Sequence, residues 1–174
     1  MEVGGRNDGI SRSHARSRRR PLSFVSVGHI RNCRMITNRS MPPGTIIPEL
    51  AYQDVREAAR WLCHAFGFRE RLRIANHRIQ LTLGDASIVV VELPPGQRSG
   101  ASHGTHGVMV HVADVHAHHA RAKAAGAQVT NPPTDYPFGE RQYSALDLGG
   151  HRWTFSESIA DIDPTTWGGE LLTP

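Results

Sequence analysis

The sequence predicts an α+β fold in which two βαβββ modules form a curved mixed sheet. Two stretches echo each other: TIIPELAYQDVREAARWLCHAFGF from residue 45 and GVMVHVADVHAHHARAKAAGAQV from residue 107. Each contains a strand-like run, an Asp-Val pair and a helical pattern that ends at glycine. Three strand candidates follow each helix, so one unit occurs twice, at about 45–94 and 105–158.

The helices have start and stop signals at matching places. Asp54 and Asp114 are expected N-caps, because their carboxylates can accept from the free amides of the first turn. Gly67 and Gly126 are expected C-caps. Apolar or small residues at spacings of three and four predict one buried stripe per helix. The first helix has such a stripe in Val55, Ala58, Ala59, Leu62, Ala65 and Phe66. The second helix is poorer in apolar residues, and its nearest equivalent is Val115, His118, His119, Ala122 and Ala125.

Period-two runs predict the strands that follow each helix. In the first module they are expected at 69–75, 78–83 and 87–93, and in the second at 128–131, 142–147 and 152–156. The turn DLGG at 147–150 joins the last two strands, as LGD joins their counterparts in the first module. Two such sheets leave one face each without a helix, and together these faces are expected to form a trough.

The first forty residues differ from the rest. They hold nine arginines against Glu2 and Asp8, a net charge of +7, so the whole-chain charge of +4 leaves −3 on residues 41–174. This segment lacks a sustained period and is expected to be a disordered basic extension, or upstream sequence if translation starts at Met35 or, as we favour, Met41. Residues 41–174 are expected to form a single domain, with a C-terminal tail at 159–174.

Composition excludes several classes of function. No apolar run approaches the ~20 residues of a membrane helix. A nucleic-acid role is disfavoured because the basic charge lies in the N-terminal extension rather than in the predicted domain. Cys33 and Cys63 occur in unrelated contexts, without a C-x-x-C motif or a His/Cys cluster. A reducing cytoplasm is therefore expected, with neither a disulfide framework nor a structural zinc site.

The duplicated unit, the stretch FGERQYSALDLGGHRWTFSE and the following ADIDPTTWGG resemble the vicinal oxygen chelate superfamily. That group includes glyoxalase I, bleomycin-resistance proteins and extradiol dioxygenases. The hairpin is similar to that of small PhnB-like members. The resemblance covers about 130 residues and implies the paired-module fold, a small-molecule ligand and a homodimer.

Metal-dependent members place one ligand on each of four strands. Aligned on the strand-to-helix junctions and the Gly-Gly turn, the corresponding positions here are Ile47, Val89, Gly107 and Thr154. None is a usual protein ligand of a divalent ion. A one-residue shift would bring in His106 alone, and an unorthodox set of Glu49, Glu92 and His111 would break the strand alternation. The resemblance therefore implies a domain without the usual metal centre and without another cofactor.

Strand alternation nominates the residues of the trough. Glu49 and His111 are the candidates for proton transfer, with a buried salt bridge from Glu49 to Arg152 or Arg141 and a core position for His111 as the alternatives. The candidate ligand-binding residues are Met109, Arg141, Tyr143, Arg152 and Thr154. Tyr143 and Trp153 are expected to supply apolar area, with stacking on a planar ligand as the alternative, and a core position is favoured for Trp153.

Other polar and aromatic residues have simpler interpretations. His116, His118 and His119 are expected on solvated helix surface, and His103 and His106 in a mobile linker. The stretch TDYPFG at 134–139 is expected to be a flexible loop over the trough, next to Glu140. Trp167 is expected to pack on the sheet or across a dimer interface.

Two functions follow from these patterns. The first is a glyoxalase/bleomycin-resistance-like protein that binds a small molecule in the trough. The second is an enzyme, such as a glyoxalase I-like lyase, an isomerase or a dioxygenase-like protein, that uses Glu49 or His111 with or without a noncanonical divalent metal. A third, a purely structural or partner-binding role, would be favoured by a trough filled with side chains.

Overall fold

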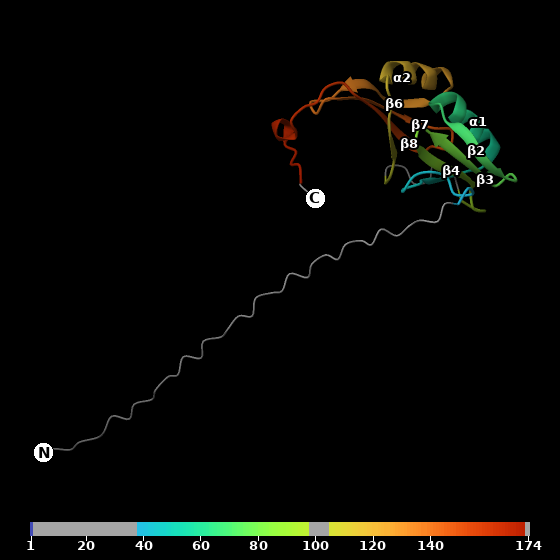
Figure 1. Cartoon of the computed structure of the whole chain (residues 1–174), viewed down its shortest axis with the longest axis horizontal. Coiled ribbons are helices and arrows are strands. Elements are labelled where there is room, and N and C mark those ends of the chain that lie inside the picture. Colours follow the sequence, from blue (N-terminus) through green and yellow to red (C-terminus); the bar gives the residue numbers. More distant parts are fainter. Residues whose placement is uncertain (2–37, 98–104, 173–174) are drawn as a thin grey trace. The chain divides into compact units, whose positions relative to one another are not determined.

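The computed structural model describes residue 1, residues 38–97 and residues 105–172 of the 174-residue chain (Figure 1). The first module forms a four-stranded sheet in the order β1-β4-β3-β2, with β1 parallel to β4 and the other pairs antiparallel. Its elements are β1 (Glu49–Tyr52), α1 (Val55–Phe66), β2 (Arg69–Ile74), β3 (Arg78–Leu83) and β4 (Ala86–Glu92).

The second module repeats this arrangement in the order β5-β8-β7-β6. Its elements are β5 (Val108–His111), α2 (Val115–Ala124), β6 (Gln128–Asp135), β7 (Glu140–Leu146) and β8 (Arg152–Ser158), followed by the short 3₁₀ helix η1 (Pro164–Trp167). The predicted α+β fold of two βαβββ modules is confirmed.

Both predicted N-caps are confirmed, because Asp54 accepts from the amide of Glu57 at 2.8 Å and Asp114 from that of Ala117 at 2.9 Å. Gly67 caps the C-terminus of α1 as expected. The expectation for α2 is off by one residue: Ala125 is the cap, and Gly126 follows it with a positive φ.

Strand β6 is longer than the sequence indicates. It continues through Pro132 and Pro133 to Asp135, with two shifts of register against β7. Because β6 is an edge strand, its prolines do not remove hydrogen bonds from the centre of the sheet. The expected loop at 134–139 is therefore shorter than predicted, since its first two residues belong to β6.

The core lies between each sheet and its helix and continues across the two modules. Phe66, at the end of α1, has its ring centroid 5.2 Å from that of Trp153 and 4.8 Å from that of Phe155, both on β8. The two helices lie side by side, and Trp61 of α1 donates to the carbonyl of Ala125 at 2.8 Å (Figure 1). The modules therefore share one apolar core.

Several expectations concern residues at the edges of this core or beyond the description. Cys33 and His103 lie outside the described residues. Trp167 is 45% exposed, with its ring 5.7 Å from that of Phe138 rather than on the sheet.

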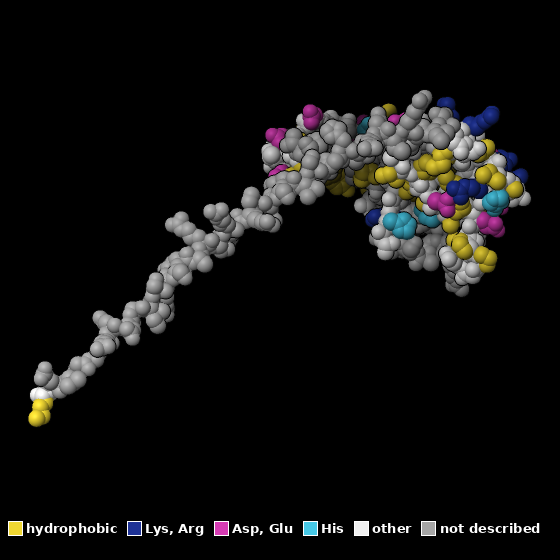
Figure 2. Space-filling view, turned by 60° about the horizontal axis from the view of Figure 1, so that its bottom comes forward, with side chains coloured by type: hydrophobic (Ala, Val, Ile, Leu, Met, Phe, Trp, Pro, Cys, Tyr) yellow, Lys and Arg dark blue, Asp and Glu magenta, His cyan; other side chains and the backbone are white. Residues whose placement is uncertain are grey.

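None of the described helices has the length and apolar character needed to cross a membrane. On the face seen in Figure 2, hydrophobic side chains alternate with acidic, basic and histidine side chains.

Candidate functional site

A cavity lies where the two modules meet, and we call it the junction cavity. Its volume is about 340 Å³. The start of β4 and the approach to β1 form one wall, and β5 forms the other. The walls are mainly apolar, with three polar residues beside them. The apolar lining residues are Ile46, Pro48, Phe68, Leu83, Ala86, Ile88, Val108, Met109 and Val110, and the polar ones are Asp85, Ser87 and His111.

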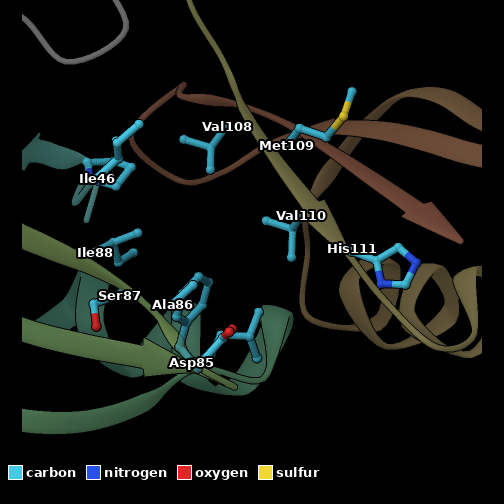
Figure 3. A pocket seen from close by; sticks show the side chains of 12 residues that line it. Ile46, Asp85, Ala86, Ser87, Ile88, Val108, Met109, Val110 and His111 are labelled. Carbon is cyan, nitrogen blue, oxygen red and sulfur yellow. The ribbon is translucent and has the colours of Figure 1, made fainter. Parts of the chain in front are cut away.

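Strand β5 presents two different faces at this cavity. Figure 3 shows the side chains of Val108 and Val110 pointing toward Ile46 and Ile88, whereas those of Met109 and His111 lie on the other face of the strand. This is the alternation expected of a strand. The predicted residues Met109 and His111 therefore border the cavity without directing their side chains into it, and Met109 is 66% exposed.

The side of each sheet that faces away from its helix is called the open face here. On the open face of the second sheet, Glu140 accepts hydrogen bonds from the hydroxyls of Ser156 and Ser158, both at 2.5 Å. These two bonds lower the pKa of Glu140, and the positive field of His111 acts in the same direction. Gln142 donates to Ser156, and His111 lies 3.4 Å from the Ser158 hydroxyl. This face therefore carries a connected polar row that ends at His111.

Two other predicted ligand-binding residues lie on the same face. Thr154 shares a hydrogen bond with Ser144, with 3.2 Å between the hydroxyl oxygens. Arg152 is exposed and packs on the backbone of Gly107, where an added Cβ would come within 2.9 Å of the guanidinium. The structure therefore brings Thr154, Arg152 and His111 to one face of one sheet.

Glu49 lies on the open face of the first sheet, but its partner is not the predicted one. It forms a salt bridge with Arg78 at 2.9 Å, and both side chains are partly exposed. The expected buried pair with Arg152 or Arg141 is wrong, since Glu49 and these arginines belong to different sheets. At the edge of β1 a water-exposed pair carries little desolvation cost.

Arg141 and Tyr143, which were predicted to bind ligand, do not lie on the open face. Arg141 pairs with Asp135 at 2.5 Å across β6 and β7. Tyr143 is 1% exposed and faces α2, and burial raises its pKa. The alternation of β7 explains both positions, because Tyr143 shares its face with the buried Ala145 while Gln142 and Ser144 take the open face.

His118 is also placed differently from the prediction of a solvated helix surface. It is 7% exposed, with Nε2 3.2 Å from the Phe66 carbonyl and Nδ1 2.6 Å from the Tyr143 hydroxyl. A carbonyl only accepts, so Nε2 carries the proton and Nδ1 accepts from Tyr143. Burial lowers the pKa of His118 to about 4, the nearby Arg121 adds to this, and the bond to Phe66 opposes it.

This histidine predicts a pH-dependent stability. The unfolded chain binds the proton with a pKa near 6.5, whereas folded His118 does so only near 4. The unfolded state therefore binds more protons between these values, and the free energy of unfolding should fall by up to about 3 kcal/mol as pH drops from 6.5 to 4. Urea denaturation at several pH values should show this slope, and His118→Gln should reduce it.

The matched control is His116→Gln, since His116 is exposed on the same helix. It should keep the slope of the parent protein. An unchanged slope in His118→Gln would show that other groups cause the acid sensitivity.

The usual metal positions of the resembled family do not fit a divalent ion here. Val89 is buried, Gly107 has no side chain, and Thr154 is engaged with Ser144. Strand pairing places Glu49 beside Val89 and Met109 beside Thr154. The residues paired with these two positions therefore provide a single carboxylate as a metal ligand. Within residues 38–97 and 105–172, no group of three or more His, Cys, Asp or Glu side chains is placed to hold one ion.

The DLGG turn has a structural task that the sequence analysis missed. The carboxylate of Asp147 accepts from the Tyr52 hydroxyl at 2.6 Å, from Trp153 Nε1 at 2.9 Å, and from the amides of Gly149 and His151 at 2.9 Å. A Cβ on Gly149 would lie 2.7 Å from the Tyr52 ring. The buried Asp147 therefore ties the β7–β8 hairpin to β1 of the other module, which explains the D-x-x-G-H-x-W spacing.

A comparison with models of protein families identifies the family of this chain. The sequence profile of the Glyoxalase/Bleomycin resistance protein/Dioxygenase superfamily matches residues 45–155. The chain belongs to this superfamily. The match spans both modules, from the approach to β1 to the middle of β8. No curated protein sequence matches the chain significantly.

Several solved structures share the fold. TioX from Micromonospora sp. ML1 is 36% identical with a TM-score of 0.57, and the match covers 67% of this chain and 99% of that chain. A family enzyme from Burkholderia phytofirmans PsJN has 19% identity and a TM-score of 0.56, covering 64% and 95%. The fosfomycin resistance protein FosX from Listeria monocytogenes has 15% identity and a TM-score of 0.56, covering 67% and 92%. At these last two identities the likeness concerns the fold alone.

Proposed function

We propose that this member of the superfamily binds a small, largely apolar molecule and acts as a glyoxalase/bleomycin-resistance-like binding protein without the usual metal centre. The observation that carries the proposal is the junction cavity. Its volume of about 340 Å³ lies in the range of small-molecule sites, and its walls are aliphatic with a few polar groups beside them. Transfer of an apolar ligand from water to such walls is favourable.

The site proposed here differs from the expected trough. The junction cavity lies between the modules, and the side chains of Val108 and Val110 that line it are on the helix side of β5 (Figure 3). The polar row of Glu140, Ser156 and Ser158 occupies the open face of the second sheet. A ligand with a polar extension that reaches around β5 would meet His111 at the end of that row.

Three finer proposals accompany this function. The hairpin motif favours the PhnB-like subgroup. The free Cys63 and the absence of a disulfide among the described residues suit a reducing cytoplasm. The 85% exposure of Ile46 and the 66% exposure of Met109, both beside the junction cavity, favour a homodimer that covers its mouth.

Native mass spectrometry of the purified full-length chain tests the proposal. We expect a copurifying small molecule at up to one equivalent per chain, and a metal content far below one equivalent by elemental analysis. Stoichiometric bound metal together with turnover of the glutathione–methylglyoxal adduct would replace the binding role by an enzymatic one. The same spectra count the subunits.

Filling the cavity should weaken binding. In Val110→Trp the indole would occupy the space between Val110 and Ile88 (Figure 3). We expect the affinity for the apolar dye anilinonaphthalenesulfonate, measured by fluorescence titration, to fall at least 10-fold, about 1.4 kcal/mol. The control Ile159→Trp adds the same ring at an exposed position outside the cavity lining and should leave the affinity unchanged. Equal losses in both variants would remove the cavity as the dye site.

One observation favours the enzymatic alternative. His111 is linked through the Ser158 hydroxyl to the ionised Glu140, which is a connected set for moving a proton. Glu49, the other predicted proton carrier, is instead occupied by Arg78. Turnover of the glutathione–methylglyoxal adduct that is lost in His111→Ala and kept in Glu49→Gln would support this alternative.

A further inference from the structure

Part of the open face of the first sheet is covered by the chain's own residues 38–44, which we call the strap. Arg71 of β2 donates to the carbonyl of Arg39 at 2.7 Å, and Gln80 of β3 donates to the carbonyl of Ser40 at 2.8 Å. Pro42 is buried in the described structure, and a Cβ on Gly44 would lie 4.0 Å from the amide nitrogen of Ser87 on β4. The strap therefore crosses β2, β3 and β4 on the side away from α1 (Figure 1).

The floor under the strap is buried and includes two polar side chains. Gln80, Ser87 and Val89 share this face because Gln80 pairs with Val89 and Thr82 pairs with Ser87. They are 4%, 1% and 3% exposed, respectively. Gln80 receives a second bond from Arg71 at 2.5 Å on its amide oxygen, so its side-chain amide is held with its nitrogen toward the strap.

The fit between strap and floor is incomplete. The hydroxyl of Ser87 is buried without a hydrogen-bond partner among the described residues. A buried hydroxyl without a hydrogen-bond partner raises the free energy of the folded state, and an acceptor supplied to Ser87 would remove this cost. The strap therefore satisfies Arg71 and Gln80 with backbone carbonyls and leaves a third polar group of the same face unsatisfied.

We propose that the strap is a displaceable internal occupant of a peptide-binding face formed by Arg71, Gln80 and Ser87. Side-chain donors that hold two successive main-chain carbonyls recognise an extended, carbonyl-rich chain rather than a particular side chain. A peptide-like ligand that also offers an acceptor to Ser87 replaces the strap. This site shares Ser87 with the lining of the junction cavity, whereas Arg71 and Gln80 lie outside that lining, so its test does not depend on a ligand of the cavity.

The strap also adjoins the junction cavity. Ile46 and Pro48 follow it directly and line the cavity, and Ser87 belongs to the cavity lining and to the floor under the strap. Release of residues 38–44 frees the backbone next to Ile46. A ligand on the peptide-binding face therefore affects the mouth of the cavity at two positions, Ile46 and Ser87.

Binding in trans tests the strap directly. The probe is a fluorescein-labelled synthetic peptide of sequence NRSMPPGTI, residues 38–46 of the chain. In the full-length protein the tethered strap competes at a high effective concentration, so the probe should bind weakly. Pro42→Asp places a charge at a buried position and should expel the strap without altering the floor. We expect Pro42→Asp to bind the probe at least 10-fold more tightly than the parent protein.

Two further variants make the result specific. Pro43→Asp, at the adjacent exposed residue, should behave as the parent protein. Gln80→Leu added to Pro42→Asp should remove the gained affinity, because it deletes the donor to the Ser40 carbonyl. Equal binding by the parent and Pro42→Asp, binding that ignores Gln80→Leu, or no binding by any variant up to about 1 mM probe would each overturn the proposal.

A second readout does not depend on the fold of Pro42→Asp. The bond after Arg39 is a trypsin site, and its cleavage requires the strap to leave the sheet. Gln80→Leu alone should accelerate cleavage at this bond at least 10-fold under conditions in which the folded unit resists the protease. An unchanged cleavage rate would show that the contact of Gln80 with Ser40 does not hold the strap.

Discussion

Replacing Asp147 by alanine is expected to lower the free energy of unfolding by about 3–4 kcal/mol. The substitution leaves the Tyr52 hydroxyl and Trp153 Nε1 without their acceptor, and both side chains are fully buried. Each orphaned buried donor costs about 1–3 kcal/mol. The amides of Gly149 and His151 lose the same carboxylate. Urea denaturation followed by tryptophan fluorescence measures the change.

Leu148→Ala is the matched control, since Leu148 is the next residue of the same turn and is 44% exposed. It should change the stability by no more than about 0.5 kcal/mol. A loss below about 1 kcal/mol in Asp147→Ala would contradict the conclusion that this carboxylate joins the hairpin to the first module.

Phe66→Ala is expected to cost about 3–5 kcal/mol. Phe66 is fully buried and is one of the residues through which α1 contacts the second module, with its ring centroid 5.2 Å from that of Trp153 and 4.8 Å from that of Phe155. Its removal leaves a cavity lined by aromatic rings that cannot collapse without moving one module against the other. The same denaturation assay measures the loss.

Phe138→Ala serves as the comparison, because Phe138 is half-buried and its ring contacts are Tyr136 and Trp167 near the C-terminal 3₁₀ helix. It should cost at most about 1.5 kcal/mol. Similar losses in the two variants would mean that Phe66 does not bridge the modules.

The fold was predictable because each module has local signals that agree with one another. Asp54 and Asp114 mark the helix starts, and the period of the strands separates buried from open faces. The error at β6 arose at Pro132 and Pro133, which indicate a loop in the sequence but are compatible with an edge strand.

The candidate site was less predictable because its geometry depends on contacts between distant residues. Strand parity correctly placed Glu49 on an open face, yet it could not reveal that Arg78 is its partner. His118 appeared to belong to a histidine cluster, whereas its neighbours Phe66 and Tyr143 come from other elements. The alternation of Glu140, Gln142 and Ser144 on β7, opposite Ser156 and Ser158, was a readable signal of the polar row.

The junction cavity and the strap had no sequence signal of their own. The cavity forms because Ile46 and Ile88 of the first module face Val110 of the second, and no local pattern links these positions. The strap lies partly within residues that composition assigned to a disordered extension, since its bonds to Arg71 and Gln80 come from backbone carbonyls. Every segment of a chain has backbone acceptors, so the sequence does not reveal which segment will use them to bind the sheet.

The most direct test of metal-free ligand binding in the junction cavity is a crystal structure of the full-length protein with its copurified molecule, with anomalous data collected for transition metals. The account predicts organic density between Ile46, Ile88 and Val110, and no anomalous peak beside Val89 or Thr154. An anomalous peak at those positions, or a cavity filled by side chains of a second copy, would contradict it.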